Sequence, residues 1–264
     1  MRTENIDSYM PVLIWLNENT GLRGRIVNPV KTSSGAHCFD DGENVYLLFD
    51  FIEGETVGKT LTHKQLLEAA DILAGLHSAG SVVPIRPEPI REDFSVPFSD
   101  SLDHFIAEDY PASPADIKAV LQPCLEQLLL KSTELKSLSE KARQKKAEMV
   151  FCHTDAHGWN LIMAEHLVLV DWEGLKLAPA EADFVMFTKR DYWEIFIGHY
   201  QKLRPEFIMD HDLLSFYILR RKIEDIWAFI EGILLDNPCD EQRKRDLNFL
   251  SNCCNTLEDS FFEL

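Results

Sequence analysis

Two short apolar runs separated by only three residues constrain the fold of this chain more than any other feature. The runs are Leu161–Met163 and Leu167–Val170, and the link between them is polar. Apolar runs this close together pair as the antiparallel strands of a hairpin. With the end of the first run opposite the start of the second, Asn160 falls beside Val170 and Asp171. An amide and a carboxylate are therefore expected together at the open end of the hairpin.

A third polar side chain leads to the same end of the hairpin. Asp155 lies in the loop between a further apolar run at Met149–Cys152, which predicts a strand, and Asn160. Asp155, Asn160 and Asp171 are thus expected to converge. Oxygen ligands without cysteine favour a hard cation such as Mg²⁺. Two such ligands, with one further carboxylate to accept the proton of a hydroxyl, form the arrangement that phosphoryl transfer requires.

The histidines of this loop allow a second interpretation. His153, Asp155 and His157 form an HxDxH pattern that also suits a zinc hydrolase. No third His or Cys ligand is obvious in the sequence, and the hairpin accounts for Asp171 better than a zinc site does. A metal-dependent hydrolase is therefore the weaker alternative.

The segment His153–Asn160, HTDAHGWN, resembles the HxDxxxxN catalytic loop of protein-kinase-like enzymes, and its second histidine marks the aminoglycoside phosphotransferase branch. The segment Asp171–Glu173 resembles the metal-binding Asp motif of that family. Within the branch, HTDAHGWN followed by DWEGLKLAP is most similar to spectinomycin phosphotransferases. The resemblance runs from about residue 10 to the C-terminus. It implies an α+β, protein-kinase-like two-lobe fold, with a reduced strand-containing N-terminal lobe and a large, mainly helical C-terminal lobe.

The resemblance also implies a role for each residue of these motifs. Asp155 corresponds to the catalytic base, and His153 to a residue that stabilises the loop. His157 is grouped with them as a structural residue or one that contacts phosphate. Asn160 and Asp171 correspond to the ligands of Mg²⁺.

Two further segments match the family outside the catalytic loop. Asp183, in AEADFVMF, resembles a downstream aspartate that braces that loop. The segment LLFDFIEG resembles the hinge between the lobes. There the Asp50 carbonyl and the Ile52 N–H are expected to face the adenine edge of ATP, or the corresponding edge of GTP.

The upper lobe departs from the family pattern. Residues 1–54 are expected to form a partial N-terminal lobe and hinge, and residues 55–264 the helical catalytic lobe. The Gly-rich strand pair and the phosphate-holding Lys of the family are not evident, since Ser33-Ser34-Gly35 is a lone turn. Lys31 is the first candidate for that Lys. We expect a shortened upper lobe, either because the gene product is short or because Met1 lies inside a longer reading frame. A catalytically weak or inactive binding module is therefore the alternative function.

The charge of the chain bears on its partners. The formal net charge is −18, from 26 basic and 44 acidic residues. Such a surface repels nucleic acid and anionic membranes and attracts cations. Solubility alone is the plainer explanation, and a substrate that carries amines is the more specific one. The candidate substrate-contacting residues are mostly acidic: Glu173, Glu224, Asp225, Trp227 and Glu231.

Other sequence features concern location. No run of about 18 apolar residues predicts a membrane span, and the first residues lack the basic-then-apolar pattern of a secretory signal. The six cysteines form no CxxC pair. We interpret them as reduced thiols of a cytoplasmic protein. The oligomeric state is left open.

Local patterns predict most of the secondary structure. Strands are expected over residues 25–32 and 44–54, and an extended loop over the Pro-rich residues 82–98. Thr62 and Gln65 form a capping box that opens a helix ending at Gly80. The remaining predicted helices are residues 8–18 with Pro11 inside, the region from Ser113 to Lys146 divided at Pro123, and most of the chain after Asp191.

These expectations combine into one function. The chain is predicted to move the γ-phosphate of a nucleoside triphosphate to a hydroxyl of an aminated small molecule, with Mg²⁺ as cofactor. The substrate class suggested by the resemblance is an aminoglycoside or aminocyclitol antibiotic such as spectinomycin.

Overall fold

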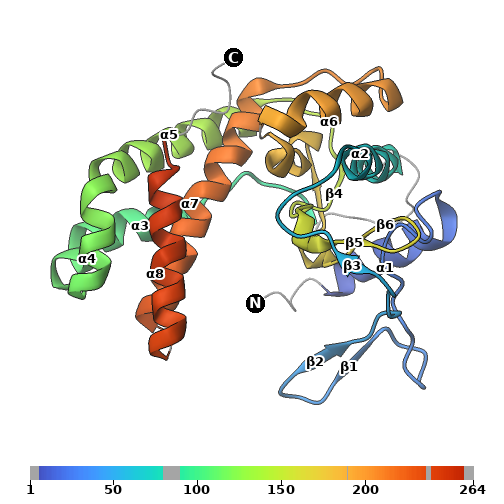
Figure 1. Cartoon of the computed structure of the whole chain (residues 1–264), viewed down its shortest axis with the longest axis horizontal. Helices are drawn as coiled ribbons and strands as arrows, with labels where there is room; N and C mark the ends of the chain where they lie inside the picture. Colours follow the sequence, from blue (N-terminus) through green and yellow to red (C-terminus); the bar gives the residue numbers. More distant parts are fainter. Residues whose placement is uncertain (1–5, 80–89, 189, 236–238, 259–264) are drawn as a thin grey trace. The chain divides into compact units, whose positions relative to one another are not determined.

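The computed structural model describes residues 6–79, 90–188, 190–235 and 239–258 (Figure 1). By its internal contacts the chain divides into two compact units. The first unit comprises residues 1–92 and 147–209, and the second comprises residues 93–146 and 210–264. Each unit is described by itself. The predicted lobe boundary at residue 54 is a different division of the chain and stays a prediction.

The first unit combines helices with short antiparallel strands. Its helices are α1 (Ile6–Asn19), α2 (His63–Ser78) and α6 (Arg190–Leu203). Its strands are β1 (Cys38–Asp40), β2 (Val45–Leu47), β3 (Glu55–Thr56), β4 (Val150–Cys152), β5 (Leu161–Met163), β6 (Leu167–Leu169) and β7 (Lys176–Ala178). They form a β1–β2 hairpin, a three-stranded sheet in the order β3-β5-β6, and a β4–β7 pair.

The predicted hairpin forms in the predicted register. Strand β5 pairs with β6 so that Met163 lies opposite Leu167. At the open end, the Val170 N–H donates to the Asn160 carbonyl at 2.9 Å. All three residues of β6 are buried, as is Leu161 of β5, so the hairpin forms part of the core of this unit.

Two strand predictions near the N-terminus are wrong in extent. Residues 25–32 form only isolated bridges, from Ile26 to Leu169 and from Pro29 to Phe49. Proline has no N–H to donate to a ladder, so Pro29 interrupts a regular strand. In the run 44–54, only β2 is a strand, because the following residues leave the hairpin and continue as irregular chain.

Helix α2 shows how the sequence positions the core. Thr62 caps it: the Gln65 N–H donates to the Thr62 hydroxyl, and the Gln65 side chain accepts from the Thr62 N–H at 2.8 Å. This is the predicted capping box. The apolar face, including Leu66 and Leu73, is buried, and α2 packs against α6 and β4. The predicted stop at Gly80 lies outside the described residues.

The second unit is helical in its described residues. It contains α3 (Pro97–His104), α4 (Ala115–Leu121), α5 (Leu125–Gln144), α7 (His211–Leu235) and α8 (Asp240–Asn255). Pro123 separates α4 from α5 within a 3₁₀ turn, as predicted. Helix α3 was not predicted, because its Pro-rich start is typical of a loop. Pro97 instead occupies the first turn, where a missing N–H costs nothing. Among the described residues, no helix is both long and apolar enough to cross a membrane.

Candidate active site

The loop after β4 is held by one buried carboxylate. The Asp183 side chain accepts from the His153 N–H at 3.0 Å and from the Thr154 N–H at 2.5 Å. Thr154 has a φ of 68°, a left-handed conformation that non-glycine residues rarely adopt. Its hydroxyl donates to the Gly174 carbonyl at 2.9 Å. These bonds stabilise an unfavourable backbone conformation directly before Asp155. The predicted bracing role of Asp183 stays a prediction, which this geometry suits.

His153 links the loop to the end of the hairpin. Its Nε2 lies 2.8 Å from the Val170 carbonyl, and its Nδ1 lies 3.3 Å from the Asp155 nitrogen. Burial lowers the pKa of the ring, which favours the neutral form. A neutral ring can donate from Nε2 to the carbonyl and accept the Asp155 N–H at Nδ1. The ring also packs edge-on against Trp172. His153 therefore orients the backbone of Asp155.

Asp155 and Asn160 are brought together as predicted from the hairpin. The Asn160 Nδ2 donates to the Asp155 carboxylate at 3.1 Å and to its backbone carbonyl at 3.0 Å. Within the described residues, the Asn160 Oδ1 accepts no hydrogen bond. His157 lies beside both residues: its Nδ1 accepts from the Asn160 N–H at 3.2 Å, and its Nε2 is 3.6 Å from the Asp155 carboxylate.

A close backbone crossing fixes the middle of the loop. The Gly58 N–H donates to the Gly158 carbonyl at 2.8 Å. A Cβ added to Gly158 would lie 2.0 Å from the Gly58 carbonyl oxygen, so any larger residue would displace the loop. Trp159 covers Gly58 and is itself 66% exposed.

Asp171 follows the second hairpin strand and also has a left-handed backbone, with a φ of 65°. Its carboxylate is exposed and makes no hydrogen bond or ion pair within the described part of the chain. The next residue, Trp172, is buried and donates to the Leu169 carbonyl at 2.9 Å. Within the described part of the chain, the Asn160 Oδ1 and the Asp171 carboxylate are thus oxygens without hydrogen-bond partners, and such oxygens are the ligand type that Mg²⁺ prefers.

The zinc interpretation finds no support in this geometry. Both ring nitrogens of His153 already have backbone partners. Among the described residues, neither His153 nor His157 belongs to a group of three or more side chains close enough to share a metal.

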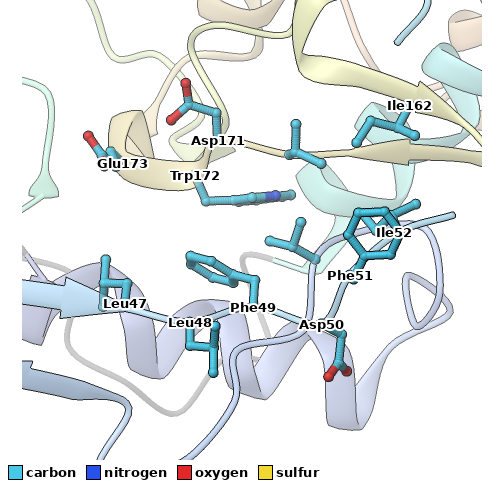
Figure 2. Close-up of a pocket in the computed structure, with 12 residues that line it drawn as sticks. Leu47, Leu48, Phe49, Asp50, Phe51, Ile52, Ile162, Asp171, Trp172 and Glu173 are labelled. Atoms are coloured by element: carbon cyan, nitrogen blue, oxygen red, sulfur yellow. The ribbon is translucent and has the colours of Figure 1, made fainter. Parts of the chain in front are cut away.

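A mostly apolar pocket of about 570 Å³ adjoins Asp171. Figure 2 shows the indole of Trp172 and the ring of Phe49 on its two sides. Asp171 and Glu173 lie at one end, and Phe51 and Ile52 lie at the other. No lysine or arginine of the described chain lines it. The pocket can therefore hold a flat apolar group between Trp172 and Phe49, with the acidic side chains of Asp171 and Glu173 at one end.

The hinge prediction concerns the apolar end of this pocket. The Asp50 N–H donates to the Asn28 carbonyl at 3.0 Å, and the Asn28 side chain donates to the Asp50 carboxylate at 2.7 Å. Within the described chain, the Asp50 carbonyl and the Ile52 N–H take part in no backbone hydrogen bond. Both residues line the pocket, so these two groups are available to a ligand.

The model of the phosphotransferase enzyme family matches residues 3–203. The chain belongs to this family. The match spans the candidate hinge, the loop after β4 and the β5–β6 hairpin, all of which belong to the first unit.

Solved structures share the fold of this phosphotransferase. A spectinomycin phosphotransferase in complex with ADP and spectinomycin has a TM-score of 0.77 and 20% identity, covering 96% of this chain and 83% of that one. An aminoglycoside phosphotransferase from Alicyclobacillus acidocaldarius has a TM-score of 0.63 and 13% identity, covering 97% of this chain and 82% of that one. A choline kinase from Streptococcus pneumoniae has a TM-score of 0.62 and 16% identity, covering 97% of this chain and 84% of that one. A search of curated protein sequences gives no match. The predicted α+β, protein-kinase-like fold is confirmed.

One residue close enough to feel the charges of this site had no signal in the sequence. Tyr9, on α1, is 1% exposed, and its hydroxyl has no hydrogen-bond partner among the described residues. Burial, followed by the charges of Glu173 and Asp171, raises its pKa to about 12. A tyrosine on an apolar helix face is typical of core packing, so the sequence alone could not distinguish this hydroxyl.

The remaining substrate candidates lie on α7, in the second unit. Glu224 and Glu231 are exposed, and Asp225 pairs with Arg221 at 2.9 Å. Trp227 packs edge-on against Phe105. Their assignment to the substrate side of the phosphotransferase stays a prediction.

Proposed function

We propose that this chain transfers the γ-phosphate of ATP or GTP to a hydroxyl of an aminated small molecule, with Mg²⁺ as cofactor. The observation that carries the proposal is the Asp155–Asn160 pair, hydrogen-bonded at 3.1 Å at the open end of the hairpin that leads to Asp171. Family membership supports the reaction type.

In this mechanism Asp155 acts as the base. Its carboxylate accepts the proton of the attacking hydroxyl and orients that oxygen toward the γ-phosphate. The Asn160 amide fixes the carboxylate from one side, and the loop N–H bonds to Asp183 fix the backbone. Most of the catalytic effect then comes from positioning, because little reorganisation is needed at the moment of attack.

The metal and the nucleotide have separate protein partners. Asn160 Oδ1 and the Asp171 carboxylate would hold Mg²⁺, which neutralises charge on the phosphates when it is bound. The base would occupy the apolar end of the pocket and bond to the Asp50 carbonyl and the Ile52 N–H. ADP in the similar spectinomycin phosphotransferase supports a nucleotide donor.

The negative charge of the chain supports an aminated acceptor. Spectinomycin and choline, named for two of the similar proteins, both carry amine or ammonium groups. The net charge of −18 favours a cationic acceptor through long-range attraction. Free thiols at all six cysteines and a nucleotide donor are consistent with a cytoplasmic location.

A nucleotide-release assay tests the function. The chain is incubated with Mg²⁺, with ATP or GTP, and with spectinomycin, choline or a neutral sugar, and diphosphate release is measured. We expect release that depends on an aminated acceptor and on Mg²⁺ and that is lost in Asp155→Asn. Binding of nucleotide without release against any acceptor would favour the binding-module alternative.

A further inference from the structure

The buried face of helix α1 carries two polar side chains, Tyr9 and Asn17, which differ in their hydrogen bonding. Asn17 donates its amide to the Leu13 carbonyl at 3.2 Å and to the Val27 carbonyl at 2.7 Å. Tyr9 lies about two turns earlier, and its buried hydroxyl meets no donor or acceptor in the part of the chain that the structure describes. Proteins seldom leave such a hydroxyl unpaired, and an ion, a water or a ligand usually completes the bond.

The hydroxyl of Tyr9 lies in the field of the acidic end of the pocket. Helix α1 packs against the turn Trp172–Gly174, which directly follows Asp171. Burial, then the charge of Glu173 and then that of Asp171, raise the pKa of Tyr9 to about 12. The hydroxyl therefore keeps its proton at neutral pH and can donate it to a carboxylate. Cys38 is the third charge on it and, as a neutral thiol, is a poor acceptor.

Asp171 has the opposite need. Its carboxylate accepts no hydrogen bond from any described residue. A carboxylate that binds a metal through one oxygen ordinarily accepts a hydrogen bond as well, and this second interaction orients it. Among the described residues that line the pocket, no lysine or arginine can supply that bond. Tyr9 is a buried donor that needs an acceptor, within electrostatic reach of a proposed metal ligand that needs a donor.

We propose that Tyr9 is a positioning residue for the metal site: when metal and nucleotide bind, its hydroxyl donates to the Asp171 carboxylate and so directs the other oxygen of that carboxylate to the metal. The hydroxyl stays protonated and does not bind the metal itself. Its effect is to hold the ligand in one orientation, which lowers the entropy cost of binding. This inference rests on the proposed function for the metal site, but not for the transfer of phosphate.

Two other partners could complete the bond of the Tyr9 hydroxyl. An ordered water would do so without any ligand. Glu173 exerts a larger charge on Tyr9 than Asp171 does. Glu173, however, already has another interaction in the chain, and Asp171 is the carboxylate whose orientation a bound metal requires.

Tyr9→Phe removes the hydroxyl and keeps the ring, and two measurements should respond differently. Without ligands, the melting temperature should equal or exceed that of the wild type, because an unpaired buried hydroxyl is replaced by an apolar group of the same shape. With ADP present, the affinity for Mn²⁺, measured by electron paramagnetic resonance, should fall roughly tenfold or more, as for loss of a group that orients a metal ligand. The affinity for ADP without metal should stay at the wild-type level.

Turnover provides a second readout of the same variant. Tyr9→Phe should need roughly tenfold more Mg²⁺ for its half-maximal rate. Its kcat at saturating Mg²⁺ should stay close to wild type, because the hydroxyl touches neither the acceptor nor the phosphates. A general loss of structure would instead lower kcat at every Mg²⁺ concentration.

The chain offers a matched control and a test of the acceptor. Tyr217 is a buried tyrosine of α7, in the second unit, and does not line the pocket. Tyr217→Phe should leave the Mn²⁺ affinity unchanged. Glu173→Gln distinguishes the two carboxylates: if Asp171 is the acceptor, Tyr9→Phe should lower the Mn²⁺ affinity by the same factor in the Glu173→Gln background.

Several outcomes would overturn the proposal. A lower melting temperature of ligand-free Tyr9→Phe with unchanged Mn²⁺ affinity would show that the hydroxyl already bonds to water. An effect of Tyr9→Phe that disappears in the Glu173→Gln background would assign the hydroxyl to Glu173. Unchanged Mn²⁺ affinity in Tyr9→Phe beside normal phosphate transfer would overturn the role of Tyr9 alone.

Failure of the proposed function gives a different pattern. If the wild type binds Mn²⁺ with ADP but transfers phosphate to no acceptor, while Tyr9→Phe still weakens the metal, the proposed function fails and the role of Tyr9 stands. A wild type that binds no Mn²⁺ in the presence of ADP would overturn both.

Discussion

The catalytic loop and the hinge side of the pocket are built in opposite ways. In the loop, the backbone and side chains around Asp155 and Asn160 are held by hydrogen bonds to buried groups. Along the hinge, apolar side chains are open to solvent: Leu48 is 64% exposed and Phe51 is 92% exposed. Exposed apolar surface of this kind is typical of a binding site. The difference suggests that the loop is preorganised for chemistry, whereas the hinge side becomes covered when it binds nucleotide.

The largest effect is expected at the metal. Asp171→Ala removes one of the two proposed oxygen ligands and should lower turnover roughly 10²- to 10³-fold, since a metal contributes several kcal/mol to charge stabilisation. Turnover is measured across a Mg²⁺ titration. Asp109→Ala, which removes an exposed aspartate of the second unit, is the control. A tight zinc site that survives Asp171→Ala would contradict the assignment and favour the hydrolase.

The next effect concerns the backbone crossing of the loop. Gly158→Ala places a methyl group 2.0 Å from the Gly58 carbonyl, so the loop must shift. We expect a loss of about 1–3 kcal/mol in the free energy of unfolding, measured by denaturant titration, together with a loss of turnover. Gly198→Ala, on α6 with open space around it, should lower the free energy of unfolding far less. Equal stability of the two variants would show that the crossing is not tight.

A smaller effect distinguishes the two ends of the pocket. Since no described lysine or arginine lines it, the base should contribute most of the affinity of the 264-residue chain. Without metal, adenosine and ATP should bind within about tenfold of each other, or 1.4 kcal/mol, by calorimetry. A much tighter triphosphate would mean that a cation outside the lining, Lys31 being the first candidate, holds the phosphates.

The smallest effect concerns salt. If the acidic surface attracts a cationic acceptor, added salt should weaken that attraction. The KM for the acceptor should then rise a few-fold as the Debye length falls from about 10 Å at 0.1 M salt to about 3 Å at 1 M. A neutral sugar acceptor should show no such change. A salt-independent KM for the aminated acceptor would show that the net charge does not help to attract it.

The sequence predicts the local parts of this site better than the parts assembled from distant segments. A three-residue link determines the hairpin and its register, and Thr62 with Gln65 determines the start of α2. The strand expected at residues 25–32 fails because a strand needs a partner ladder, which a local pattern does not reveal.

The support behind the catalytic loop could not be predicted in the same way. His77 and Tyr200 are 123 residues apart, and each resembles an ordinary core residue of an amphipathic helix. Only the packing of α2 against α6 brings them to Asp183. The buried hydroxyl of Tyr9, which lacks a partner among the described residues, could not be predicted either, because Tyr9 resembles an ordinary core residue of a helix.

A crossed pair of variants tests the central claim, that the loop performs chemistry while the pocket beside the hinge binds nucleotide. Asp155→Asn alters the loop, and Ile162→Ala removes an apolar contact from the pocket, with the exposed Ile208→Ala as control. Nucleotide affinity and the single-turnover rate of phosphate transfer are measured on the same samples.

The two variants are expected to give opposite results. Asp155→Asn should lose roughly 10²-fold or more in transfer rate, as for loss of a general base, with nucleotide affinity close to wild type. Ile162→Ala should weaken nucleotide binding several-fold, with a transfer rate at saturating nucleotide close to wild type. An unchanged transfer rate in Asp155→Asn, or a parallel fall of rate and affinity in either variant, would contradict the account.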